Sequence, residues 1–246
     1  MRHFDLGGNK TDLAYEKIKE LVVNLQVKPG EQLQITELSE HLAVSVTPVR
    51  EALTRLHAEG LIMMISKRGF FSRNIDVRDL HDLYELAFVI LKHSVKRGIQ
   101  SYECNGIFEE FDFDSSGWRP DALNPKSRAQ RYAKQLERFY ESIVQLSGNA
   151  AMIAAVKSFN DRSHFIRLAD LSIEENFQLI FADMAELVTL LAAGDADEAV
   201  ANLRRQTKAK LIRLPALARD CLASAYLSQV SDAPATDLPA RPVNVS

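Results

Sequence analysis

Apolar residues recur at helical spacing in the stretch that ends near residue 58. One face of the predicted helix carries residues three or four positions apart, namely Val49, Ala52, Leu53 and Leu56. Thr47 can cap the start of this helix, and Pro48 after it needs no backbone N–H in the first helical position. Arg50 and Thr54 lie on or beside the opposite face, which is short, polar and cationic. The pattern predicts a helix with one buried and one exposed face.

A shorter helix precedes it in the sequence TELSEHL. Thr36 can cap this segment, and Leu38 and Leu42 are its buried positions. Residues 43–46 leave room for nothing more than a turn between two crossing helices. The two segments together predict a helix-turn-helix.

The sequence around this motif predicts a small winged domain. After Gly60 come apolar residues 61–65, a polar and basic tip at 66–69, and then Phe70 and Phe71, which is the pattern of a β-hairpin. Upstream, a helix is expected from Thr11 to the Lys-Pro-Gly sequence at 28–30, and residues 1–10 are expected to be a flexible arm. An extended link at 33–35 can pair with the hairpin, so we place the domain at residues 1–76.

From Val77 onward the remaining periodicity is helical. We expect helices at residues 79–100, 127–146, 150–169, 172–194 and 195–227, the last with Asp195 and Glu198 as a capping box and with Pro215 inside it. Residues 101–125 are mostly loop, and the Pro-rich residues 229–246 are expected to be disordered. The fold class predicted is mainly α: an N-terminal winged helix-turn-helix, then an all-α antiparallel helical bundle at residues 77–228.

Composition fits two modest domains. Of 246 residues 46% are hydrophobic and 26% charged, which is ordinary for a globular protein. No apolar run approaches 18 residues, and the N-terminus lacks the apolar segment of a signal peptide, so we expect a cytoplasmic protein without a membrane partner. Cys104 and Cys221 are far apart and lack metal-binding spacing, so we expect reduced, packed thiols.

Net charge alone does not predict the partner. The chain carries −3, and residues 1–76 contain ten Lys or Arg against ten Asp or Glu. Distribution is more informative, because five basic residues crowd the second helix and the hairpin: Arg50, Arg55, Lys67, Arg68 and Arg73. Such a patch suits phosphate contacts, and a dimer would double them.

The sequence LSEHLAVSVTPVREALTRLHAEGL resembles the winged helix-turn-helix signature of GntR-family transcription regulators, with PVREAL as its most specific part. The helical remainder resembles the FadR-type branch, whose C-terminal FCD domain is a ligand-binding helical bundle. The segments that carry this second resemblance are DLHDLYEL, SGNAAMI and AAGDADEAVANL. The resemblance implies a homodimer that binds a two-fold symmetric double-stranded DNA operator and changes that binding when a small metabolite enters the bundle.

The same resemblance implies which residues approach DNA. They are Thr36, Ser45, Val46, Thr47 and Arg50 of the helix-turn-helix and Lys67, Arg68 and Gly69 of the wing. Arg50 suits a bidentate guanine contact, and the hydroxyls and wing cations suit phosphates or groove edges. Val46 stands where family members often have Arg, so this chain lacks one charged DNA contact.

The bundle departs from the family in its metal site. Most FCD domains hold a divalent metal with one Asp and three His, and the matching positions here are Leu136, Tyr140, Met184 and Gln206. None of the four is a good ligand for Zn²⁺, Ni²⁺ or Mn²⁺, because these ions prefer imidazole or carboxylate. We therefore expect no metal and no cofactor.

Without a metal, the bundle centre is expected to bind an organic acid with an apolar portion. The predicted effector-binding residues are Ala87, Leu91, Leu136, Tyr140, Arg162, Met184 and Gln206. Arg162 matches an inward Arg of the family and suits a carboxylate clamp, although a surface or interhelical ion pair explains it equally well. Tyr140 can also be simply core.

Two other functions are considered. An enzyme is not expected, because the sequence contains no P-loop, no GxGxxG after a strand, no HExxH and no GxSxG. A DNA-binding dimer whose bundle serves only for dimerisation stays open. A filled bundle centre would favour that alternative, and a cavity of a few hundred cubic ångströms beside Arg162 would favour an effector.

Overall fold

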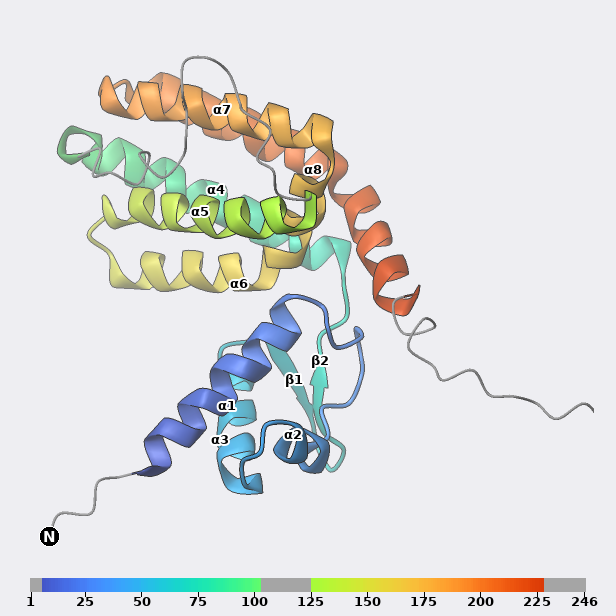
Figure 1. Ribbon diagram of the computed structural model, residues 1–246. Helices are drawn as coiled ribbons and strands as arrows, with labels where there is room; N and C mark the ends of the chain where they lie inside the picture. Colours follow the sequence, from blue (N-terminus) through green and yellow to red (C-terminus); the bar gives the residue numbers. More distant parts are fainter. Residues whose placement is uncertain (1–5, 103–124, 228–246) are drawn as a thin grey trace, which may run out of the picture.

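The computed structural model describes residues 6–102 and 125–227. It confirms the mainly α fold class, with a small two-stranded sheet after the helix-turn-helix. The N-terminal part contains α1 (Leu6–Val23), α2 (Ile35–His41), α3 (Val46–Ala58), β1 (Ile62–Ile65) and β2 (Gly69–Ser72). Figure 1 shows this part below the helical bundle, with a short linker rising from β2 into the bundle.

Helix α3 forms because its apolar face closes the core of the N-terminal part. Val49, Leu53 and Leu56 are fully buried and pack with Ile18 of α1, which crosses α3. Burying a side chain of this size contributes about 1.5–3 kcal/mol, so the packing of α1 on α3 accounts for much of the stability of this part.

The hairpin pairs as the sequence predicts. Strands β1 and β2 are antiparallel, with Met63 opposite Phe71. The upstream link also joins this sheet, but two residues earlier than expected: Leu33 N–H donates to Phe70 O at 2.8 Å, and Ser72 N–H donates to Glu31 O at 2.9 Å. This extra pairing holds the hairpin against the helices.

Several predicted helix starts are shifted. Helix α1 begins at Leu6 rather than Thr11, and α3 begins at Val46 with Ser45, not Thr47, as its N-cap. Thr36 lies inside the first turn of α2 instead of capping it, and Ser172 ends α6 rather than capping α7. The physical reason at α3 is that the backbone N–H groups of the first helical turn have no acceptor within the helix. Proline, which lacks this N–H, is therefore tolerated at the third helical position, where Pro48 lies, as well as at the first.

The bundle is built from five helices and one short 3-10 turn in the described residues. They are α4 (Val77–Gly98), η1 (Ile99–Ser101), α5 (Pro125–Gln145), α6 (Ala150–Ser172), α7 (Glu174–Ala192) and α8 (Ala196–Leu227). Helix α5 packs along α6 and α4 along α8, around a core that includes Phe139, Phe177 and Leu187. The predicted cap of α8 is confirmed, because Asp195 Oδ1 accepts from Glu198 N–H at 3.2 Å.

Most of the predicted loop at 101–125, residues 1–5 of the predicted arm, the predicted tail and Cys104 lie outside the described residues. Cys221 is buried as expected, and its burial raises the thiol pKa to about 11. The domain limits at residues 76 and 228 stay predictions.

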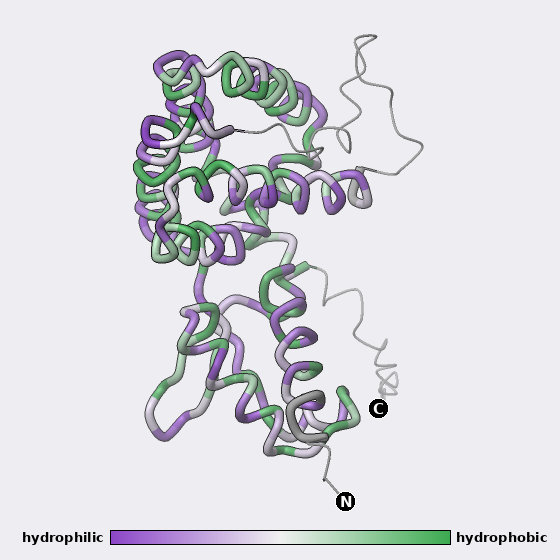
Figure 2. Tube along the Cα trace, turned by 90° about the vertical axis from the view of Figure 1, so that its left-hand side faces the viewer, coloured by the Kyte–Doolittle hydropathy of each residue, from purple (hydrophilic) through white to green (hydrophobic). Residues whose placement is uncertain are grey.

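Hydrophobic and hydrophilic residues are interspersed along the helical turns of both parts of the molecule, as the colours of Figure 2 show. No helix in the described ranges is long and apolar enough to cross a membrane.

The two parts of the molecule meet along α1, α6 and the end of α8. Lys19 of α1 pairs with Asp161 of α6 at 2.6 Å, and both side chains are partly buried. The Lys28 ammonium lies 5.8 Å from the centre of the Tyr226 ring near the end of α8. Helix α8 extends below the rest of the bundle toward the N-terminal part (Figure 1). The N-terminal part is therefore in contact with α6 and α8, and also with the start of α4, where Arg73 pairs with Asp79.

Candidate DNA-binding surface and bundle cavity

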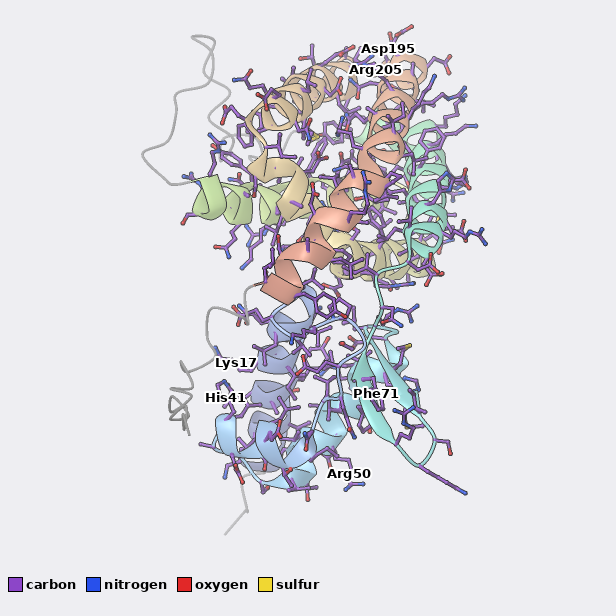
Figure 3. The ribbon with its side chains drawn as sticks, turned by 90° about the vertical axis from the view of Figure 1, so that its right-hand side faces the viewer. Lys17, His41, Arg50, Phe71, Asp195 and Arg205 are labelled. Carbon is purple, nitrogen blue, oxygen red and sulfur yellow. The ribbon has the colours of Figure 1, made fainter. Side chains whose placement is uncertain are left out.

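The outer face of α3 is free in the described structure. Ser45, Thr47 and Arg50 are exposed, and no hydrogen bond or ion pair of the Arg50 side chain is found among the described residues. Arg50 points away from the bundle at the far end of the molecule (Figure 3). Val46 is 40% exposed on the same turn, so the position where relatives carry Arg does face outward. Thr36 at the start of α2 is also exposed.

The wing tip is held in a fixed shape. Gln32 Nε2 donates to Arg68 O at 2.7 Å, and the Arg68 guanidinium lies 5.3 Å from the centre of the Phe71 ring. Lys67 and Gly69 both have positive φ, 61° and 100°, so the tip turns sharply and leaves Lys67 and Arg68 exposed. The predicted wing cations are therefore available to phosphates.

Two of the five basic residues expected in this patch point elsewhere. Arg55 pairs with Asp12 at 3.4 Å and Glu59 at 3.2 Å and lies 3.8 Å from the centre of the Tyr15 ring. Arg73 pairs with Asp79 at 3.1 Å where the linker meets the bundle. The basic surface is smaller than the sequence predicts, because helical phase turns Arg55 toward α1.

A cavity of about 380 Å³ lies inside the bundle between α4, α5, α6, α7 and α8. Five of the seven predicted effector residues line it: Ala87, Leu91, Leu136, Tyr140 and Gln206. Phe88, Phe159, Ile180 and Leu203 add to its apolar wall. This volume is in the range of small-molecule sites.

Met184 does not reach this cavity. Its side chain is 1% exposed and packs in the bundle core with Leu136 and Leu187. Helix α7 instead contributes Leu179, Ile180 and Asp183 to the wall.

The four positions that match the family's metal ligands carry neutral side chains. Tyr140 Oη donates to Gln206 Oε1 at 2.9 Å, and Gln206 Nε2 donates to Asn202 Oδ1 at 2.6 Å. Burial raises the pKa of Tyr140, so its oxygen stays a protonated phenol and not an anionic ligand. With Leu136 and Met184 at the other two positions, this donor set does not fit a divalent metal.

Arg167 of α6 lines one end of the cavity. Its guanidinium pairs with Glu137 and donates to Ser163 Oγ at 3.2 Å and Asn160 Oδ1 at 3.3 Å. Burial raises the pKa of Glu137, but the hydrogen bond from His164 and the charge of Arg167 outweigh it, so the pKa is lowered overall. Glu137 is thus held ionised and fixes Arg167 in place.

A second ion cluster closes the same end. Asp170 is fully buried and binds Lys210 and both Nε and Nη2 of Arg213, the latter two at 3.1 Å. Burial lowers the pKa of Lys210 to about 8, although the carboxylate of Asp170 opposes the shift. Lys210 and Arg213 both line the cavity.

This end of the cavity carries more positive than negative charge at pH 7. Three cations, Arg167, Lys210 and Arg213, are matched by the two carboxylates Glu137 and Asp170. Tyr84 also lines the cavity, and its buried hydroxyl, which lies near Ser163, makes no hydrogen bond of normal geometry within the described part of the chain. An unpaired donor beside excess positive charge suits an anionic group.

Sequence reasoning missed Tyr84, Arg167, Lys210 and Arg213, although a signal existed. Tyr84 is three residues before Ala87, and Lys210 and Arg213 follow Gln206 at helical spacing. Projection of Ala87 and Gln206 by one or two helical turns would have found Tyr84, Lys210 and Arg213, whereas Arg167 lies on a different face of α6 from the predicted Arg162 and could not be found in this way.

Arg162 does not lie in the bundle cavity. It is five residues from Arg167, which is about 140° around α6, and it lines a pocket between the bundle and the N-terminal part. Arg162 therefore does not line the bundle cavity, whereas Arg167 of the same helix does.

The chain is similar to known bacterial regulatory proteins. Two family models match: bacterial regulatory proteins, gntR family, over residues 10–71, and FCD domain over residues 120–208. The Nta operon transcriptional regulator of Aminobacter aminovorans is 31% identical over 185 residues, covering 74% of this chain and 83% of that protein. The uncharacterized HTH-type transcriptional regulator YdhC of Bacillus subtilis is 22% identical over 170 residues, covering 69% and 75%.

Solved structures share the fold. A transcriptional regulator GntR from Rhodococcus sp. RHA1 aligns with a TM-score of 0.65 at 17% identity, covering 85% of this chain and 98% of that one. Escherichia coli McbR/YncC aligns with a TM-score of 0.57 at 17% identity, covering 89% and 98%.

Proposed function

The chain belongs to the gntR family of bacterial regulatory proteins and carries an FCD domain, and we propose that it is a homodimeric regulator controlled by an organic acid bound in the bundle cavity. It is a DNA-binding transcription regulator and not an enzyme. Because it acts on chromosomal DNA, we propose that it is located in the cytoplasm.

The DNA contacts proposed are those of α2, α3 and the wing. Helix α3 enters the major groove, where the free guanidinium of Arg50 can donate two hydrogen bonds to one guanine. Ser45, Thr47 and Thr36 bind phosphates or groove edges, and Lys67 and Arg68 reach the backbone with Gly69 allowing the close approach. Val46 contacts bases or thymine methyls only through apolar atoms, so the operator differs at that position from those of relatives with Arg.

A second copy of this chain is proposed to cover the outer face of α4 and α8. Val89 of α4 and Ile212 of α8 are 58% and 71% exposed and lie on this face. Glu85 flanks the apolar residues on the α4 side, and Arg204 and Lys208 flank them on the α8 side. A two-fold axis through this face brings the acidic edge of each copy to the basic edge of the other.

The observation that carries the effector proposal is the cavity with an apolar wall and one cationic end. A carboxylate can accept from Arg167 and from the Tyr84 hydroxyl, while the carbon skeleton packs on Ala87, Leu91 and Leu136. The alternative, a bundle that serves only for dimerisation, calls for a filled centre. A cavity of about 380 Å³ argues against it.

A thermal-shift screen of carboxylic acids tests the effector. At a hundredfold excess over its dissociation constant, a bound acid is expected to raise the melting temperature by about 5 °C or more. Ala87→Phe fills the apolar end without touching a charge and should remove the shift. If no carboxylate with two to twelve carbons shifts the wild-type melting temperature, the bundle is a dimerisation core.

A further inference from the structure

Arg162 faces a second, much smaller cavity at the junction of the two parts of the molecule. The cavity measures about 60 Å³, which is room for several waters or one small anion. Its walls come from the end of α1, the linker after β2, the start of α4, and α6. Any molecule bound there touches both the DNA-binding part and the bundle.

The guanidinium of Arg162 is not neutralised. Its Nε is buried and has no hydrogen-bond partner, and no ion pair of Arg162 is found among the described residues. Burial and the charge of Arg73 lower the pKa of Arg162, and Asp79 only partly opposes them. Arg162 as a whole is partly buried, and its one buried N–H without a partner costs free energy, which a bound acceptor would recover.

The acidic side chains that line this cavity are already engaged. Asp79 pairs with Arg73 at 3.1 Å, Asp161 pairs with Lys19 at 2.6 Å, and Asp76 accepts from Arg78 N–H at 2.8 Å as the cap of α4. The charges of Arg73 and Lys19 are thus balanced by Asp79 and Asp161. Of the remaining charged groups on the lining, Asp76 caps α4, and Arg162 is a cation without an ion-pair partner among the described residues.

We propose that this junction cavity binds a small oxyanion, of the size of acetate or orthophosphate, between Arg162 and Arg73. The guanidinium of Arg162 supplies the fork of N–H donors that matches two oxygens of such an anion. Arg73 belongs to the segment after β2 and Arg162 to α6, so the anion braces the wing side of the DNA-binding part against the bundle. This site is separate from the effector cavity and does not depend on it.

Calorimetric titration of the full-length protein with sodium phosphate and with sodium acetate tests the site. Sodium chloride at matched ionic strength is the blank. One of the two anions is expected to bind beyond the chloride blank, and Arg162→Gln should weaken that binding about tenfold or more, because it removes the charged donors. Which anion binds identifies the source, phosphate or a small carboxylate.

Two control variants make the result specific. Arg219→Gln removes one exposed positive charge on α8 and should leave anion binding unchanged. Arg167→Lys alters the effector cavity and should also leave it unchanged, which separates this site from the proposed effector site. The proposal is overturned if neither anion binds beyond chloride, or if Arg162→Gln binds as tightly as wild type. Retained binding in Arg162→Gln together with weakened binding in Arg167→Lys would assign the anion to the bundle cavity instead.

Discussion

Arg50 is the side chain on which specific DNA binding should depend most. It is exposed, unpaired in the described structure and on the outer face of α3. We expect Arg50→Ala to cost about 1–3 kcal/mol of operator binding and to relax the preference at one base pair, because alanine cannot donate the two hydrogen bonds to a guanine. Fluorescence anisotropy with operator and scrambled duplexes at one salt concentration measures both effects.

Arg55→Gln is the matched control for this variant. It removes the same charge from the same helix, but from the face that pairs with Asp12 and Glu59. Its sequence preference should equal that of wild type. Unchanged preference in Arg50→Ala would refute the role of Arg50.

The lowered pKa of Lys210 makes the stability of the fold depend on pH. Its pKa falls from 10.5 in the unfolded chain to about 8 in the fold, so between these values the unfolded state binds more protons. The free energy of unfolding therefore rises with pH from 8, by about 1 kcal/mol up to pH 9. Above that, Cys221 opposes the rise, because burial raises its pKa from 9.0 to about 11. Urea unfolding at pH 7, 8 and 9 measures the slope, and Lys210→Met should lack it.

The face of the helix on which a side chain lies could be predicted from the sequence for some residues and not for others. The exposure of Arg50 could be predicted, because the apolar residues of α3 pack against the core and leave the opposite face of the helix exposed. The positions of Arg162 and Met184 did not follow, because a shift of one position along a helix turns a side chain by about 100°. Family correspondence placed Arg162 on the right helix but not on the face that lines the bundle cavity.

Among the elements, the wing should contribute affinity for DNA without sequence preference. Lys67 and Arg68 are exposed at its tip and should contact phosphates. Replacing both with Ala should weaken operator and scrambled duplexes by similar factors, and should lower the slope of log affinity against log salt by about 0.9 for each phosphate that the wing no longer binds. Affinity measured across a salt series gives this slope. A change in sequence preference with an unaltered slope would contradict phosphate contact.

The elements themselves were largely predictable. Helices α3, α4, α5, α6 and α8 and the hairpin follow from the period of their apolar residues, and the cap of α8 from Asp195. The first residues of α1, α2 and α3 could not be predicted in this way, since several neighbouring residues can cap the first turn of a helix. The pairing of Glu31 and Leu33 with the hairpin depends on tertiary packing, so its approximate place could be predicted from the sequence but its register could not.

At the scale of the whole molecule, the proposed dimer face can be tested directly. Ile212 is 71% exposed on α8 within the apolar patch. Ile212→Glu should convert the dimer to a monomer in sedimentation experiments, because two copies of the new carboxylate would be buried near the two-fold axis.

Leu13→Glu provides the comparison for the dimer experiment, since Leu13 is 48% exposed on α1 outside this face. That variant should remain a dimer. A dimeric Ile212→Glu protein would move the interface elsewhere.

Two helices of the bundle both line the cavity and contact the DNA-binding part. Helix α6 carries Arg167 in the cavity and Asp161 at the contact with α1, and α8 carries Lys210 in the cavity and Tyr226 beside Lys28. In the proposed mechanism, an acid that shifts either helix changes these contacts to the DNA-binding part. A difference in affinity between the two arrangements is what couples effector to operator.

Operator binding titrated with the acid found in the thermal-shift screen is the most direct test of this central claim. Wild type should change its operator affinity about tenfold or more when the acid is saturating, a coupling of about 1.4 kcal/mol. Arg167→Lys, which keeps the charge but loses the guanidinium fork, should bind operator normally and respond weakly or not at all. An acid that binds the protein yet leaves operator affinity unchanged, or that acts equally on Arg167→Lys, would contradict control through the bundle cavity.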